Sequence, residues 1–142
     1  MPIAERTFSK FLQHPNDIMS DLARGPVLLR RRDQDNLVVM TGEQNEALTK
    51  ALQTFTSVAV HGSSAAATSL PWLYFLPAKD QRECLAELAS AVTAALSTGR
   101  LDLLRDTLYA WEATGVAAWD YRNRGGQPGY DEETPVDVER PA

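Results

Sequence analysis

The chain has 142 residues, of which 44% are apolar and 23% are charged, an ordinary composition for a globular protein with one modest core. No apolar run approaches the roughly 20 residues that a membrane-spanning helix needs, and we expect no signal peptide because the first residues lack an apolar stretch. The single cysteine, Cys84, cannot form an internal disulfide, so we expect a cytoplasmic protein that does not associate with membranes.

The net charge of −5 is unevenly distributed along the chain. Residues 1–60 hold seven basic and seven acidic side chains, whereas residues 61–142 hold seven basic and twelve acidic ones. We therefore expect the first part to bind any nucleic acid. The acidic second part would suit a basic protein partner.

The first forty residues predict two short helices followed by a β-hairpin. Apolar side chains recur at helical spacing from Phe8 to Leu12, and Pro15 starts a second helix over residues 15–24. Residues 25–40 then hold two aliphatic runs on either side of the turn-type segment Asp33-Gln34-Asp35-Asn36. This pattern is typical of a β-hairpin.

The hairpin brings three consecutive arginines to the end of its first strand. At a period of two, Arg31 shares a face with Val27 and Leu29, while Arg30 and Arg32 share the other face with Leu28. Clustered guanidinium groups at a sheet edge favour an anion-binding surface. The alternative is a solvated strand end whose arginines pair with the nearby Asp33 and Asp35.

The rest of the chain predicts helices interrupted by one linker. Thr41 has the character of an N-cap for an amphipathic helix over residues 42–60, and residues 61–69 are small and uncharged, as in a linker. After the aromatic stretch 70–77, apolar stripes over residues 85–96 and 101–118 predict an antiparallel helical hairpin. We expect residues 120–142, rich in glycine, proline and acid, to be disordered.

No catalytic or metal-binding motif is present in the sequence. There is no glycine-rich phosphate loop and no nucleophile motif, and His14 and His61 have no metal-ligand spacing with each other or with Cys84. The acidic run Asp131-Glu132-Glu133 stands in a segment that we expect to be too flexible for catalysis. We therefore expect neither an enzyme nor a bound cofactor or metal.

Two stretches of the chain resemble a known family. The string FSKFLQHPNDIMSDLARGPVLLRRRDQDNLVVM is similar to the N-terminal domain of the Phd/YefM, or prevent-host-death, antitoxins. The strings LPWLYFLPAKDQRECLAEL and LYAWEATG resemble the C-terminal extension of longer members. The resemblance covers about residues 5–119 and implies an α+β fold, with a small antiparallel sheet, flanking helices and a helical extension.

The resemblance also implies a division of labour. Residues 1–60 would form a dimerising, DNA-binding domain, and residues 70–119, after the linker, would bind a cognate toxin, by family analogy an RNA-cleaving RelE/ParE-like protein. Such an antitoxin binds operator DNA as a homodimer, or a higher oligomer, and represses its own operon. Residues Gly115 and Ala117–Asp120 depart from the family pattern. The alternative is a helical adaptor that keeps this fold and binds only protein.

Site residues follow from the same resemblance. In the family, two arginines contact DNA, and their positions correspond to Lys10 and Arg31 here, so a lysine replaces the first arginine. Neighbouring basic side chains complete the predicted DNA-binding set. The predicted DNA-binding residues are Arg6, Lys10, Arg30, Arg31 and Arg32. The predicted toxin-binding residues are Leu70, Trp72, Phe75, Leu104, Leu108, Trp111 and Trp119. For the aromatic side chains Trp72, Tyr74, Phe75, Trp111 and Trp119, the alternative is an ordinary core of the helical hairpin.

Overall fold

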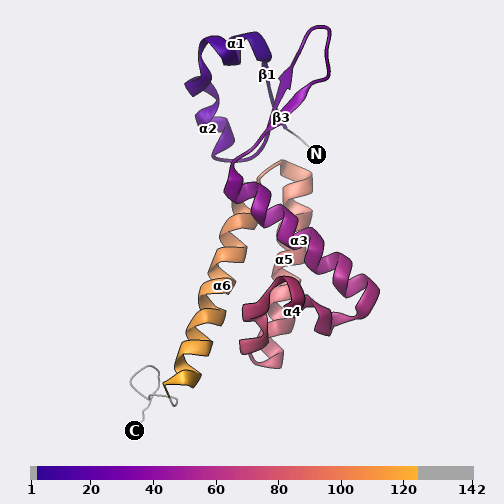
Figure 1. Cartoon of the computed structure of the whole chain (residues 1–142), viewed down its shortest axis with the longest axis vertical. Helices are drawn as coiled ribbons and strands as arrows, with labels where there is room; N and C mark the ends of the chain where they lie inside the picture. Colours follow the sequence, from indigo (N-terminus) through magenta and orange to yellow (C-terminus); the bar gives the residue numbers. More distant parts are fainter. Residues whose placement is uncertain (1–2, 125–142) are drawn as a thin grey trace.

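A computed structural model describes residues 3–124 and shows an α+β fold in two parts (Figure 1). We call residues 3–39 the N-terminal unit and residues 40–124 the helical unit. The N-terminal unit holds the sheet and two short α-helices, and the helical unit holds three long helices. Figure 1 shows the N-terminal unit at one end of the molecule and the end of the last helix, α6 (Leu101–Asn123), at the other.

The sheet has three strands in the order β1-β2-β3. Strand β2 (Val27–Arg30) pairs antiparallel with β3 (Leu37–Val39), which confirms the hairpin, but it also pairs parallel with β1 (Ala4–Thr7). The prediction of an antiparallel sheet was therefore wrong, because the sheet is mixed. The sequence did not predict strand β1. This edge strand has no buried side chain, so its sequence shows no apolar alternation.

Short helices connect β1 to β2 and cover one face of the sheet. Helix α1 (Phe8–Gln13) is capped by Thr7, whose Oγ1 accepts a hydrogen bond from the backbone N–H of Lys10 at 3.3 Å. The predicted helix over residues 15–24 is a 3-10 turn, η1 (Pro15–Ile18), followed by one α-helical turn, α2 (Met19–Leu22). The core of this unit consists of Ile18, Leu22, Val27 and Leu29, with Phe8, Phe11 and Val39 packed against them.

The helical unit is built on α3 (Gly42–His61), α5 (Ala78–Thr98) and α6 (Leu101–Asn123). The predicted N-cap is confirmed, because Thr41 Oγ1 accepts a hydrogen bond from the Gln44 N–H at 3.1 Å. The predicted helical hairpin is α5 and α6, and Gly99, with a left-handed φ of 75°, ends α5 and turns the chain. No helix within residues 3–124 is long and apolar enough to cross a membrane.

The predicted linker is a packed part of the helical unit. It forms η2 (Ser63–Ala65) and α4 (Ala66–Ser69), and η3 (Pro71–Phe75) follows directly. Ala66 is fully buried and shares one core with Ala47 and Ala51 of α3. Small side chains let this segment approach α3 closely. The small, uncharged residues that predicted a flexible linker therefore pack against α3. The two units therefore meet near residue 40, and α3 belongs with the second unit.

Helix α6 is longer than predicted. It continues through Asn123, so residues 120–123 are helical and not part of a disordered tail. Tyr121 lies in this added turn, and Trp119, directly before it, packs edge-on against Phe75. The remainder of the predicted tail, residues 125–142, lies outside the described residues.

Candidate functional site

Three arginines of the predicted DNA-binding set gather at one end of the sheet. Arg30 ends β2, Arg31 and Arg32 begin the β2–β3 loop, and all three line a hollow of about 750 Å³. The other side of this hollow is formed where β1 passes into α1, by Thr7, Phe8 and Ser9; Asp33 and Gln34 complete the lining. Figure 1 shows this loop projecting from the molecule, at the end remote from α6. We call this group of three side chains the arginine cluster.

Arg31 is held in place by its surroundings. Its guanidinium carbon lies 5.4 Å from the centre of the Phe8 ring, a cation–π contact. Its backbone N–H donates to Asn36 Oδ1 at 3.0 Å, and its Nη1 donates to the backbone carbonyl of Asp35 at 3.4 Å. None of these three contacts involves a carboxylate, so the guanidinium charge is not neutralised. Arg31 is therefore oriented and still available to an anion.

The other two arginines of the cluster differ in their partners. Arg30 Nε donates to Glu5 Oε1 at 2.7 Å. This hydrogen bond and the positive charge of Arg30 lower the pKa of Glu5. Within residues 3–124, the Arg32 side chain forms no hydrogen bond or ion pair. One member of the cluster is thus paired with a carboxylate, and two carry unneutralised charge.

Arg6 and Lys10, the remaining predicted DNA-binding residues, do not line the hollow. Arg6 stands beside Leu29 in the sheet register, on the face opposite to Arg30, and its Nη2 lies 2.6 Å from Asp21 Oδ2. Lys10 is exposed on α1. The predicted set of five therefore divides into a cluster of three and two separate basic residues.

Sequence reasoning missed the residues that complete this site. Thr7, Phe8 and Ser9 are distant from the arginines in sequence and reach them only because β1 lies parallel to β2. The same pairing brings Glu5 to Arg30. The available signal was the Thr-Phe-Ser sequence, in which Thr7 could be recognised as a helix N-cap.

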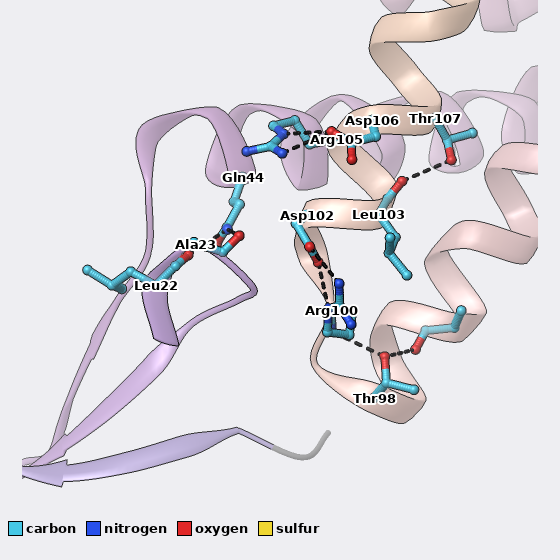
Figure 2. Close-up of polar contacts among 11 residues, drawn as sticks. Leu22, Ala23, Gln44, Thr98, Arg100, Asp102, Leu103, Arg105, Asp106 and Thr107 are labelled. Atoms are coloured by element: carbon cyan, nitrogen blue, oxygen red, sulfur yellow. Dashed lines mark hydrogen bonds and ion pairs between the residues drawn. The ribbon is translucent and has the colours of Figure 1, made fainter. Parts of the chain in front are cut away.

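The arginine-bearing unit is fixed to the helical unit by a buried junction (Figure 2). The side chain of Gln44, on α3, is fully buried, and its Nε2 donates to the backbone carbonyls of Leu22 at 2.7 Å and Ala23 at 3.3 Å. The Asp102 N–H, at the start of α6, donates to the Arg24 carbonyl at 3.3 Å. These bonds join the end of α2 to both α3 and α6.

A salt bridge supports the α6 side of the junction. Arg100 donates to both carboxylate oxygens of Asp102, at 2.9 Å from Nε and 2.8 Å from Nη2, and Figure 2 shows the two side chains facing each other. The hydrogen bond from Arg100 lowers the pKa of Asp102. A negative charge in the first turn of α6 also interacts favourably with the helix dipole.

Most of the predicted toxin-binding residues lie in the core. Leu70, Leu104 and Leu108 are buried, and Trp72 is only 7% exposed. In this conformation these four side chains are covered by the rest of the helical unit, and for Trp72 this agrees with the alternative interpretation as core. Large apolar side chains are expected in either setting, and only tertiary packing distinguishes the two.

Trp72 also explains an unusual glycine in α6. A Cβ atom added at Gly115 would lie 2.8 Å from the Trp72 carbonyl oxygen and 3.0 Å from Cε3 of the Trp72 indole. The indole therefore lies directly on the helix backbone. Trp111, one turn before Gly115, is partly buried, and its Nε1 donates to Glu87 Oε1 on α5 at 3.0 Å. These tryptophans hold η3, α5 and α6 together.

An exposed aromatic edge lies where η3 meets the end of α6. The ring of Phe75 stands 6.2 Å from both Tyr74 and Trp119, and these two are 71% and 46% exposed. An adjoining groove of about 860 Å³ is lined by Phe75, Pro77, Ala113, Thr114, Ala117, Ala118, Tyr121 and Arg122. Of the predicted toxin-binding residues, Phe75 and Trp119 belong to this edge.

The described residues offer little for catalysis or metal binding. Within residues 3–124, no group of three His, Cys, Asp or Glu side chains is arranged to hold a metal ion. The thiol of Cys84 is buried, and burial, together with the nearby Glu87, raises its pKa to about 12. A protonated, inaccessible thiol is a poor nucleophile.

The observations that bear on function are therefore an arginine cluster at one end of the molecule and an exposed aromatic edge toward the other. Comparison of the chain with protein-family models, curated proteins and solved structures found no match.

Proposed function

We propose that this chain is a type II antitoxin, which binds operator DNA through the N-terminal unit and a cognate toxin through the helical unit. The arginine cluster is the observation that carries the proposal. Arg30, Arg31 and Arg32 meet around one hollow with hydroxyl groups at its edge, and such a combination suits phosphate groups of nucleic acid. The resemblance to Phd/YefM antitoxins supports the same assignment.

DNA affinity in such a site would come mainly from charge. Each phosphate neutralised by an arginine releases condensed counterions, so the binding constant falls steeply as salt rises. Arg31, oriented by Phe8, and Arg32, without a partner among the described residues, are the two available cations. We assign phosphate contact first to these two residues.

A homodimer would double this positively charged surface. Val38 is 54% exposed and lies beside Leu28, on the sheet face opposite to the core residues Val27 and Leu29. A second copy packed on the β3 side of this face, away from Glu5 and Arg30 on the β1 side, would also add burial to a unit that is small for independent stability. We assign dimerisation to the N-terminal unit on this basis, and light scattering of the purified chain tests it. A monomer at micromolar concentration would contradict the symmetric model.

The toxin would bind at the aromatic edge formed by Tyr74, Phe75 and Trp119. Exposed aromatic side chains frequently dominate the affinity of protein interfaces, and the groove beside them is apolar. Residues 61–124 hold six basic and seven acidic side chains, and residues 125–142 hold one basic and five acidic ones, so the net negative charge that would attract a basic toxin lies largely in a segment outside the described residues. An RNA-cleaving RelE/ParE-like toxin remains the family-based proposal. No catalytic role is assigned to the chain itself.

A titration of the full chain against duplex DNA from its own upstream region, over a series of salt concentrations, tests the DNA-binding half. Changing both Arg31 and Arg32 to Ala should weaken binding and reduce the slope of log affinity against log salt by about 2, since each lost phosphate contact removes roughly 0.9. The matched control changes Lys79 and Arg82, two exposed basic residues of α5, to Ala. This control should leave both quantities unchanged.

The toxin-binding half needs a separate measurement. In a co-expression growth assay with the neighbouring toxin gene, Trp119→Ala should release toxicity while DNA binding is retained. The adaptor alternative predicts protein binding without salt-dependent DNA binding. DNA affinity that does not depend on salt, or that is equal in the arginine variant and in its control, would contradict the proposal.

A further inference from the structure

Glu5 accepts a hydrogen bond from Arg30, a member of the arginine cluster. It lies on β1 beside Leu28, two positions before Thr7, which is the register partner of Arg30. Arg30 lies two residues after Leu28 on the same face of the sheet, so the Glu5 side chain reaches it diagonally across the two parallel strands. Glu5 Oε1 is 2.7 Å from Arg30 Nε. Both side chains are about half exposed, so the pair lies open to solvent at the edge of the hollow.

A phosphate oxygen and the Glu5 carboxylate would compete for the same guanidinium. Both are oxyanions that accept charge-assisted hydrogen bonds from arginine. An exposed ion pair contributes little to folding stability, so exchanging Glu5 for a phosphate would not disturb the sheet. The carboxylates of Asp33 and Asp35, although close in sequence, form no hydrogen bond with the arginine cluster within the described residues.

We infer that Glu5 sets the nucleic-acid affinity of the arginine cluster by occupying Arg30 in the DNA-free protein. This inference rests on the proposed DNA-binding function and identifies the residue that adjusts it. Glu5 engages Nε of Arg30 and neutralises its charge, so a phosphate that approaches the Nη groups competes with a carboxylate already in place. The cluster thus presents two unneutralised arginines to any polyanion, and the full charge of the third becomes available only when a phosphate replaces the carboxylate.

The test is a double-mutant cycle on the full chain, measured with the same upstream duplex DNA and salt series. Glu5→Gln keeps the shape of the side chain and removes its charge. It should raise affinity by up to about fivefold, the range of an exposed ion pair, and steepen the salt slope by up to about 0.9. In an Arg30→Ala background the same substitution should raise affinity no more than Asp35→Asn does, because only the through-space effect of one lost negative charge remains.

A second substitution separates this effect from simple loss of negative charge near DNA. Asp35→Asn removes the same charge from the adjacent loop, where only the backbone carbonyl of Asp35 contacts an arginine. Its effect on DNA affinity should be smaller than that of Glu5→Gln and should be the same with or without Arg30. A thermal melt of each variant shows whether the fold is retained.

The outcomes distinguish the inference from the proposed function. If the unmodified chain shows no salt-dependent DNA binding, the proposed function fails. If it binds DNA and Arg30→Ala weakens binding while Glu5→Gln has no effect, only the inference fails. The inference is also overturned if Glu5→Gln raises affinity as much in the Arg30→Ala background as in the unmodified chain, or if Arg30→Ala leaves affinity unchanged.

Discussion

At the scale of single residues, burial decides what Cys84 can do. Its pKa of about 12, raised by burial and by Glu87, leaves the thiol protonated over the physiological range. We expect almost no reaction of the folded protein with a thiol reagent at pH 8, and one reactive thiol per chain after denaturation. A colorimetric thiol assay measures both. Rapid stoichiometric labelling of the folded chain would show that α5 opens locally or that the side chain is accessible.

Two glycines allow a matched pair of substitutions. A Cβ added at Gly25 would clash with the backbone carbonyl oxygen of Gly99, so Gly25→Ala should force the two units apart and cost about 1–3 kcal/mol of stability. At Gly42, in the first turn of α3, a Cβ meets nothing within 4 Å. Gly42→Ala should therefore stabilise the protein by about 0.5–1 kcal/mol. Urea unfolding of both variants checks the prediction, and equal effects would contradict the close contact at the junction.

At the scale of elements, the contact between α3 and the end of α2 depends on the side-chain amide of Gln44. Gln44 supplies the donor for the Leu22 and Ala23 carbonyls, while its own Oε1 has no partner among the described residues. Gln44→Leu removes this donor from the buried Leu22 carbonyl and from the partly buried Ala23 carbonyl, which should cost about 1–3 kcal/mol. The control Gln53→Leu changes an exposed position of the same helix and should be close to neutral.

Hydrogen exchange locates the effect of that substitution. In Gln44→Leu, amide protection should fall around residues 22–25, where α2 meets β2, and should persist in α5. Unchanged protection there, with unchanged unfolding free energy, would mean that apolar packing and not the Gln44 amide holds the junction.

At the scale of the whole molecule, the structure predicts resistance to proteolysis in residues 65–69. Ala66 and Leu70 are fully buried, and α4 packs on α3, so this part of the predicted linker is not available to an extended protease cleft, whereas residues 61–64 are exposed. Limited digestion with elastase, which cleaves after small residues, should spare this segment in the folded chain and cut it after thermal unfolding. Early cleavage there in the native protein, with release of two stable fragments, would restore the linker interpretation.

The sequence by itself determined the local features of this protein. The hairpin around Asp33–Asn36, the Thr41 cap, the Gly99 helix end and the helices α3, α5 and α6 were predictable, because turn chemistry, capping and apolar periodicity act over a few residues. The three arginines of the cluster were predictable for the same reason, being consecutive in the chain.

Tertiary structure alone decided which of these features meet. Strand β1 carries no apolar signal and is a strand only because β2 offers hydrogen bonds to it, and that parallel pairing brings Thr7 and Glu5 to the arginine cluster. Ala66 looks like linker in sequence and is core in space, while Trp72 and Trp119 look alike in sequence and differ in burial. Burial and pairing depend on residues far away in the chain, which no local pattern specifies.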